Sequence, residues 1–172
     1  MPATPADLMA ALARLGIAVS TVEHAAVFTV ADARALRGAI RGAHTKNLFL
    51  VDKKGALFLV TAEEEAEIDL KHLHNLIGAS GRLSFGKPEL LMAVLGVPPG
   101  AVTPFAAIND ADRRVTIVLD TALAAAATIN AHPLVNTATT TIAVPDLLAF
   151  LRATGHDPRI LAVASARAAR EL

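Results

Sequence analysis

Apolar residues that recur every three or four positions predict several short helices along the chain. Leu8, Leu12 and Leu15 have this spacing, and they follow the segment Thr4-Pro5-Ala6-Asp7. That segment is typical of a helix start, because threonine caps free N–H groups, proline is tolerated in the first turn and the aspartate completes a capping box. Similar start and stop signals predict further helices over residues 29–37, 69 or 70–77, 88–95, 121–127 and 145–153.

Runs of leucine, phenylalanine and β-branched residues predict the strands. The segment His44-Thr45-Lys46-Asn47 opens an apolar strand at 44–51, and the turn Asp52-Lys53-Lys54-Gly55 joins it to a second apolar run at 56–62, which together indicate a β-hairpin. Other strands are expected at 17–22, 83–85, 113–120, 128–131, 137–143 and 159–163. Because helices and strands are interspersed and two strand pairs are hairpin-like, we expect an α/β fold with a mixed central β-sheet flanked by helices.

Length and composition narrow the class of protein. A chain of 172 residues is most simply one domain over 1–172, and 53% hydrophobic with 19% charged residues is typical of a compact globular protein. We expect neither a membrane span nor a signal peptide. The sequence has no cysteine, which excludes disulfides, thiolate nucleophiles and zinc–thiolate sites, so a cytoplasmic protein is the natural inference.

Charge is neutral overall but segregated along the chain. The formal net charge of zero argues against a protein that coats long nucleic acids such as DNA. Acidic residues crowd 63–69, whereas 33–54 is basic. A basic surface around Lys46 would attract a phosphate-bearing ligand, and a solvated charged face is the alternative. The basic residues of this segment are Arg34, Arg37, Arg41, Lys46, Lys53 and Lys54.

Several common catalytic motifs are missing from the sequence. It contains no G-x-S-x-G elbow, no Walker lysine loop and no G-x-G-x-x-G fingerprint. His72 and His74 lie two residues apart on a predicted helix and so face different directions, which disfavours a shared metal. His24 and His156 are expected to be surface loop histidines. Small polar residues at the ends of elements remain as candidates, namely Lys46, Asn47, Thr103, Asn109, Asp110, His132, Asn136 and Thr139.

Lys46 is the most informative of these candidates. It stands where a rigid strand meets solvent, so its ammonium can be held in one place and still reach an anion. The alternative is a strand-end lysine whose stem lies along the protein while its charge stays in water.

Three motifs in order resemble the YbaK/prolyl-tRNA synthetase-associated editing family. They are Thr45-Lys46-Asn47-Leu48-Phe49-Leu50, the stretch Gly100-Ala101-Val102-Thr103-Pro104-Phe105 with Ile108-Asn109-Asp110 after it, and His132-Pro133-Leu134-Val135-Asn136-Thr137-Ala138-Thr139. Val27-Phe28-Thr29 also has a counterpart there. The resemblance covers about residues 4 to 163, and it is strongest to the free-standing branch that deacylates alanyl-tRNA(Pro).

The resemblance implies hydrolysis of the ester between a mischarged amino acid and the 3′-terminal adenosine of tRNA. It implies no metal, no cofactor and no covalent intermediate. Lys46 matches the family's essential lysine, which positions the terminal phosphate or the ester, and Asn47 lies beside it. Gly100 to Pro104 matches a loop that backs the aminoacyl pocket, and His132 matches a histidine that faces the same pocket.

Physical chemistry is consistent with these roles. An aminoacyl ester is already activated, so a site need only hold it, offer N–H donors to the developing oxyanion and admit a water molecule. We expect the N–H groups of Gly100 and Ala101 to be those donors, and His132 with Asn47 to orient the substrate or its water.

Binding residues follow from the same scheme. Choosing alanyl over prolyl groups needs a pocket too small for the proline ring. The expected substrate contacts are Ile40, Val102, Thr103, Pro104, Phe105, Ile129 and Asn136. The expected contacts to tRNA phosphates are Lys53, Lys54, Arg82 and Lys87.

Two alternatives stay open beside the alanyl-tRNA(Pro) hydrolase. One is a deacylase for another small amino acid on tRNA, such as cysteine or serine, and the other is a tRNA-binding module without catalysis. The intact Lys46 and His132 count against the second. The expected partners are the acceptor end of tRNA(Pro) and prolyl-tRNA synthetase, with no DNA, no membrane and a monomeric state.

Overall fold

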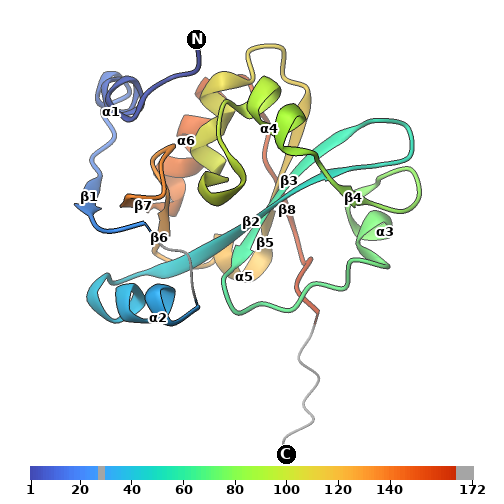
Figure 1. The fold of residues 1–172 in the computed structure, drawn as a ribbon, viewed down its shortest axis with the longest axis horizontal. Helices are drawn as coiled ribbons and strands as arrows, with labels where there is room; N and C mark the ends of the chain where they lie inside the picture. Colours follow the sequence, from blue (N-terminus) through green and yellow to red (C-terminus); the bar gives the residue numbers. More distant parts are fainter. Residues whose placement is uncertain (27–29, 166–172) are drawn as a thin grey trace, which may run out of the picture.

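The computed structural model describes residues 1–26 and 30–165, apart from some side chains of the second helix (Figure 1). The expected cap at Thr29, the stretch Val27-Phe28-Thr29 and the side chain of Arg37 lie outside this description. The described helices are α1 (Pro5–Arg14), α2 (Val30–Ala39), α3 (Leu73–Ile77), α4 (Pro88–Leu95), α5 (Thr121–Ala124) and α6 (Val144–Ala153), with the 3₁₀ helices η1 (Pro99–Ala101) and η2 (Pro104–Asn109). The described strands are β1 (Ser20–Glu23), β2 (Ala43–Val51), β3 (Leu57–Glu63), β4 (Ser84–Phe85), β5 (Val115–Asp120), β6 (Thr128–Ala131), β7 (Ala138–Ala143) and β8 (Arg159–Leu161).

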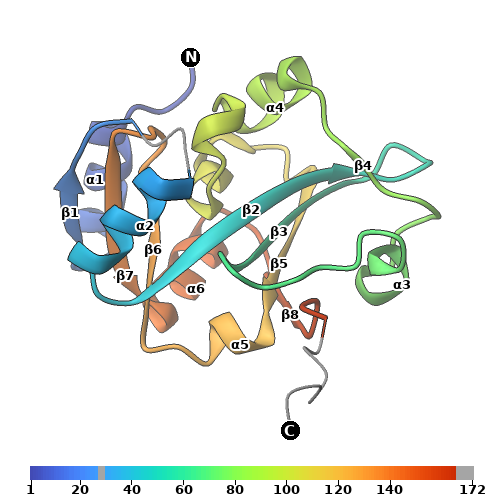
Figure 2. The ribbon, with the colours of Figure 1, turned by 60° about the horizontal axis from the view of Figure 1, so that its bottom comes forward.

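The described strands form one mixed sheet, which confirms the expected fold class. Their order is β1-β7-β6-β2-β3-β5-β8, and β4 pairs with β2 outside this path. The β2–β3 hairpin is antiparallel, as predicted, whereas β3 with β5 and β5 with β8 are parallel. β2 crosses the molecule, pairing with β6 at its start and with β4 at its end (Figure 2). This long strand therefore connects the two ends of the sheet.

Both faces of the central strands are buried, because side chains alternate between two apolar clusters. Leu57 and Leu59 of β3 pack in the first cluster with residues of α1, α4, η2 and α6. Phe58 and Val60 pack in the second cluster with residues of α3. On β2, Phe49 belongs to the first cluster and Leu50 to the second.

Local sequence signals predicted the bounds of some helices correctly and those of others only in part. Thr4 and Asp7 form the predicted capping box, and α4 runs from Pro88 to Leu95 with Gly96 after it, as predicted. α5 ends at Ala124 rather than at residue 127, because the chain turns there to start β6. The expected helix at 69 or 70–77 begins only at Leu73, because the Asp69 side chain accepts hydrogen bonds from Lys71 N and His72 and closes a turn there.

The three prolines at 97–105 predict a loop, but part of this stretch is helical. It contains η1 and the start of η2. Thr103 caps η2 through its hydroxyl, which accepts from the N–H of Phe105, and Pro104 fits the first turn because no N–H is needed there.

His156 was expected to be a surface histidine, and this was wrong. It is 6% exposed, and its Nε2 donates to Oδ2 of Asp110 at 2.9 Å. The same carboxylate accepts from the backbone N–H groups of Arg114 and Val115. Asp110 therefore ties the end of α6 to the start of β5.

Replacing Asp110 by asparagine is expected to lower the free energy of unfolding by roughly 3 kcal/mol, because it removes a buried carboxylate that accepts from His156, Arg114 N and Val115 N and leaves donors without an acceptor. Urea denaturation followed by circular dichroism measures this loss. Asp112→Asn is the matched control, since Asp112 is exposed and its replacement should change stability by less than about 0.5 kcal/mol. Equal urea midpoints for the two variants would contradict the proposed role of Asp110.

Candidate active site

Lys46 and Asn47 are neighbours on β2 but project to opposite faces of the sheet. Lys46 is half-buried and its Nζ donates to the carbonyl of Ala66, in the segment between β3 and α3. Asn47 lies on the face of Phe49, where its Oδ1 accepts from the hydroxyl of Thr61 at 2.6 Å. The ammonium has three donors, and a neutral carbonyl takes one of them without cancelling its charge.

The strand that carries Lys46 pairs with the strand that leads into His132. β2 and β6 are parallel, with Ala43 opposite Ile129 and His44 opposite Asn130. Nδ2 of Asn130 lies 3.5 Å from Nε2 of His44, so these two side chains share a face. Lys46 lies two residues beyond the paired His44 on β2, and His132 directly follows the last residue of β6.

His132 is held in one orientation by the strand that follows it. Its Nδ1 donates to the carbonyl of Ala138 at 2.9 Å, so in the neutral ring Nε2 is left as an acceptor. The intervening loop is tight, because Leu134 has φ of 69° and its N–H donates to the carbonyl of His132. A left-handed leucine is strained, and such strain persists only where the surrounding structure enforces it.

His24 stands next to His132, which the sequence did not indicate. The two ring centroids are 6.4 Å apart. Nδ1 of His24 donates to the carbonyl of Ala25, so its Nε2 accepts from the hydroxyl of Thr139 at 2.8 Å. The prediction of a surface loop histidine did not include this contact, because its partner on β7 is 115 residues away.

The glycine–proline loop contacts the histidine loop. A Cβ on Gly100 would lie 3.4 Å from Nδ2 of Asn136, so these two predicted site residues are neighbours. The N–H of Ala101, however, donates to the carbonyl of Pro98 at 3.0 Å within η1. That donor is engaged within the loop, which leaves Gly100 as the better placed of the two expected oxyanion donors.

The other expected substrate contacts support the loop from inside the protein. Phe105 is fully buried and meets Phe150 edge-on at 5.7 Å between ring centroids. Ile129 packs in the first cluster. Their role as pocket walls stays a prediction, as it does for the remaining residues of the set, which are the buried Ile40, Thr103 and Pro104 and the half-buried Val102.

The four expected phosphate contacts lie at one end of the sheet. Lys53 and Lys54 lie in the β2–β3 turn, while Arg82 and Lys87 flank β4. Asp52 holds the turn to the segment before β4, since its carboxylate accepts from the N–H groups of Ser80, Ala56 and Lys54. These hydrogen bonds, that from Ser80 above all, hold the pKa of Asp52 below its ordinary value.

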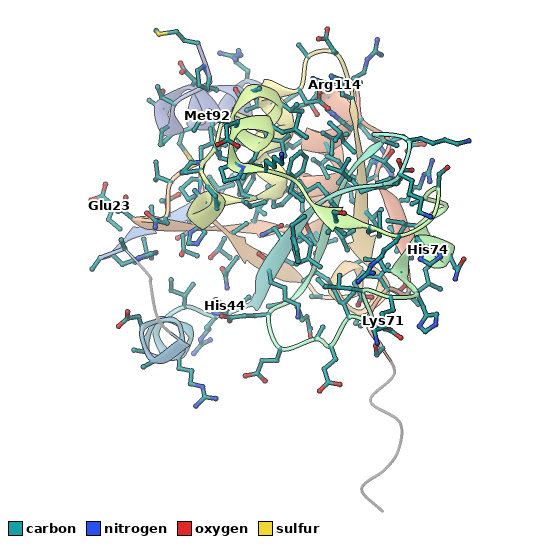
Figure 3. All side chains as sticks on the ribbon, turned by 45° about the vertical axis from the view of Figure 1, so that its right-hand side comes forward. Glu23, His44, Lys71, His74, Met92 and Arg114 are labelled. Carbon is teal, nitrogen blue, oxygen red and sulfur yellow. The ribbon has the colours of Figure 1, made fainter. Side chains whose placement is uncertain are left out.

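Two hollows border these elements. One of about 650 Å³ lies behind the histidine loop and is lined by residues of α1, by Glu23 and His24, and by Pro133, Val135 and Ala138. A smaller one of about 280 Å³ lies at the start of β2, beside His44 (labelled in Figure 3) and Glu63 to Glu65.

Two features are absent from the described part of the chain. Within residues 1–26 and 30–165, no three histidine, aspartate or glutamate side chains are grouped so that they could ligate a metal ion. None of the helices described in that range has the length and apolar character needed to cross a membrane.

Comparison with known proteins defines the class to which this site belongs. A model of the aminoacyl-tRNA editing domain matches residues 24–150, which includes the motifs of Lys46, Gly100 and His132. The chain therefore belongs to the aminoacyl-tRNA editing domain family, as its motifs indicated.

Individual relatives agree with this assignment. The chain is 41% identical to prolyl-tRNA synthetase associated domain-containing protein 1 of Danio rerio, covering 87% of this chain and 82% of that protein. It is 34% identical to the prolyl-tRNA editing protein ProX of Acetoanaerobium sticklandii, covering 87% and 91%. A solved structure described as a candidate trans-editing enzyme for prolyl-tRNA synthetase shares the fold, with a TM-score of 0.68, 24% identity and coverage of 94% and 98%.

Proposed function

We propose that this protein is a trans-editing hydrolase that removes alanine from mischarged alanyl-tRNA(Pro). The observations that support this best are the pairing of β2, which carries Lys46, with β6, which leads into His132, and the contact of Gly100 with Asn136. A cation, a histidine acceptor and a glycine loop thus come from elements that neighbour each other in space. The names of the ProX relative and of the synthetase-associated relatives favour tRNA(Pro) as the substrate carrier.

In the proposed mechanism, Lys46 anchors the 3′ end of the tRNA. Its ammonium exchanges the neutral carbonyl of Ala66 for a phosphate or ester oxygen, and a phosphate gives the stronger, charge-assisted hydrogen bond. Because β2 is a rigid strand, the anchor fixes the ester against the site and removes much of the entropic cost of reaction.

The water molecule is oriented by His132. With Nδ1 engaged by Ala138, the ring presents Nε2 as the acceptor for a proton of the attacking water. The N–H of Gly100 donates a hydrogen bond to the oxyanion that forms on the carbonyl oxygen. A hydroxyl of the terminal ribose assists the proton transfer, and the products are alanine and free tRNA(Pro).

In this mechanism, Asn47 is a positioning residue for Lys46. Since it faces Thr61 on the other side of β2, it holds the strand in place and thereby positions Lys46. Ala101 similarly stabilises η1, because its N–H donates a hydrogen bond to the carbonyl of Pro98.

Selection among amino acids rests on the size of the pocket. A hydrophobic pocket distinguishes one methylene group by about 1–3 kcal/mol, and a rigid wall excludes a larger ring more strongly. Phe105 and Ile129 are buried and tightly packed in the core, so the pocket wall that they support cannot move back to admit the proline ring.

We expect the protein to deacylate tRNA(Pro) carrying alanine at least about tenfold faster than the same tRNA carrying proline, a difference of about 1.4 kcal/mol in barrier. The test charges tRNA(Pro) separately with alanine, serine, cysteine and proline and measures the loss of each ester. Faster release of cysteine or serine than of alanine would identify the other small-amino-acid deacylase. No hydrolysis of any of these esters would favour the binding module without catalysis.

A further inference from the structure

One exposed aromatic side chain lies among the cations at the end of β2 and has no part in the mechanism above. Phe85 of β4 is 60% exposed. Lys53, Lys54, Arg82 and Lys87 lie in the turn beside β4 or within three residues of Phe85. A single exposed apolar residue is ordinary, but an aromatic ring surrounded by cations is the combination that binds unpaired nucleotides.

Few carboxylates oppose these cations. Asp52 is buried, and its oxygens are engaged by backbone N–H groups. Glu89, in the first turn of α4, is the acidic residue that follows β4. The segment from Arg82 to Lys87 contains none. The surface around Phe85 is therefore positive and matches a phosphate chain.

The fold holds Phe85 on a rigid support. Phe85 pairs with Leu50 of β2, and the N–H of Gly86 donates to the carbonyl of Phe49 at 2.9 Å. A Cβ at Gly86 would lie 2.4 Å from carbons of the Phe49 ring, so only glycine lets β4 lie this close to the sheet. The Lys53 stem lies against Gly81, where a Cβ would be 2.8 Å from Cδ of that lysine.

Phe85 and Lys46 lie on the same face of the sheet. Residues opposite each other in an antiparallel pair point to one side, so Phe85 shares the face of Leu50. Leu48 and Lys46 follow on that face at intervals of two residues. Four residues along a strand at ~3.3 Å each, and one strand spacing of ~4.8 Å sideways, give about 14 Å between the two backbone positions.

We propose that Phe85 is a stacking platform for a base near the 3′ end of the tRNA, with the surrounding cations holding the adjacent phosphates. This inference rests on the proposed function, because it assumes that Lys46 holds the terminal nucleotide. At ~3.4 Å per nucleotide, about four stacked nucleotides span the roughly 14 Å between Lys46 and Phe85. A stacked single-stranded tail of that length then contacts the protein at both ends. The contact depends little on sequence, since every base has an aromatic face.

The chain offers a direct spectroscopic test because it contains neither tryptophan nor tyrosine. Phe85→Trp introduces a single fluorophore at the platform. Met92→Trp is the matched control, since Met92 (labelled in Figure 3) is 45% exposed on α4 and is not one of the residues of the cationic surface. The probe is an uncharged hairpin, carrying no amino acid, with the acceptor stem of tRNA(Pro) and a 3′ CCA tail. We expect the hairpin to quench the indole fluorescence of Phe85→Trp and to leave that of Met92→Trp nearly unchanged.

A second variant separates binding from chemistry. Phe85→Ala should raise the Kd for the hairpin and the KM for alanyl-tRNA(Pro) roughly 5- to 100-fold, while kcat and the hydrolysis of alanyl-adenosine stay the same. An effect on kcat alone would overturn the proposal.

The outcomes separate this inference from the proposed function. If the wild type deacylates alanyl-tRNA(Pro) but saturating hairpin leaves the fluorescence of Phe85→Trp unquenched, the stacking platform is excluded and the face is left for a protein partner. If the hairpin quenches Phe85→Trp while the wild type hydrolyses none of the tested esters, the platform is supported and the hydrolase is not.

Discussion

Replacing Lys46 by alanine is expected to lower kcat/KM for alanyl-tRNA(Pro) roughly 10²- to 10³-fold, because it removes the charged donor that fixes the ester in the site. Lys46 has a half-buried stem and lies on a rigid strand, so a neighbouring lysine cannot take over its position. Deacylation of alanyl-tRNA(Pro) at limiting substrate measures the effect.

Lys71→Ala is the control for lost charge. Lys71 is an exposed lysine just before α3 (Figure 3), so its removal changes the net charge equally and should leave the rate within about twofold of wild type. Lys46→Arg tests geometry, since a planar guanidinium does not reproduce a compact ammonium. If Lys46→Ala and wild type hydrolyse alanyl-tRNA(Pro) equally fast, Lys46 has no role in the mechanism.

Replacing His132 by alanine is expected to lower kcat about 10²-fold or more, with a smaller change in KM, because the acceptor for the proton of water is lost. Rapid quenching at saturating alanyl-tRNA(Pro) measures kcat.

His132→Asn distinguishes chemistry from loop structure. The asparagine N–H can still donate to the carbonyl of Ala138, so the loop is retained, but the Nε2 acceptor is missing. We expect it to be as slow as His132→Ala while unfolding at the wild-type temperature. His72→Ala, at an exposed histidine beside Asp69, is the neutral control. A His132→Asn variant with wild-type kcat would assign the histidine to structure alone.

Local sequence signals predicted the elements whose causes lie within a few residues. The hairpin around the Asp52 to Gly55 turn depends on adjacent apolar runs and a short polar turn. α4 depends on Pro88 at its start and Gly96 after its end. The mixed sheet followed from the order of such elements.

Contacts between distant residues were not predictable in this way. His156 binds a carboxylate 46 residues away, and His24 binds a hydroxyl 115 residues away. A single sequence carries no local sign of such pairs, so both residues were predicted to be surface loop histidines. The hydrogen bond from the Ala101 N–H to the carbonyl of Pro98 was also not predicted. It belongs to a 3₁₀ turn, whereas the prolines around it predict a loop.

The amino-acid sequence by itself determined the class of fold, the family motifs and the identity of Lys46, Gly100 and His132 as candidates, since these depend on residue type and spacing. Only the tertiary structure decided which of them meet. The parallel pairing of β2 with β6 brings the strand of Lys46 beside the strand that leads into His132, and the alternation of side chains turns Asn47 to the face opposite Lys46. The pairing of β4 with β2 then places Phe85 on the face of Lys46, because register is a property of strands that are far apart in the chain.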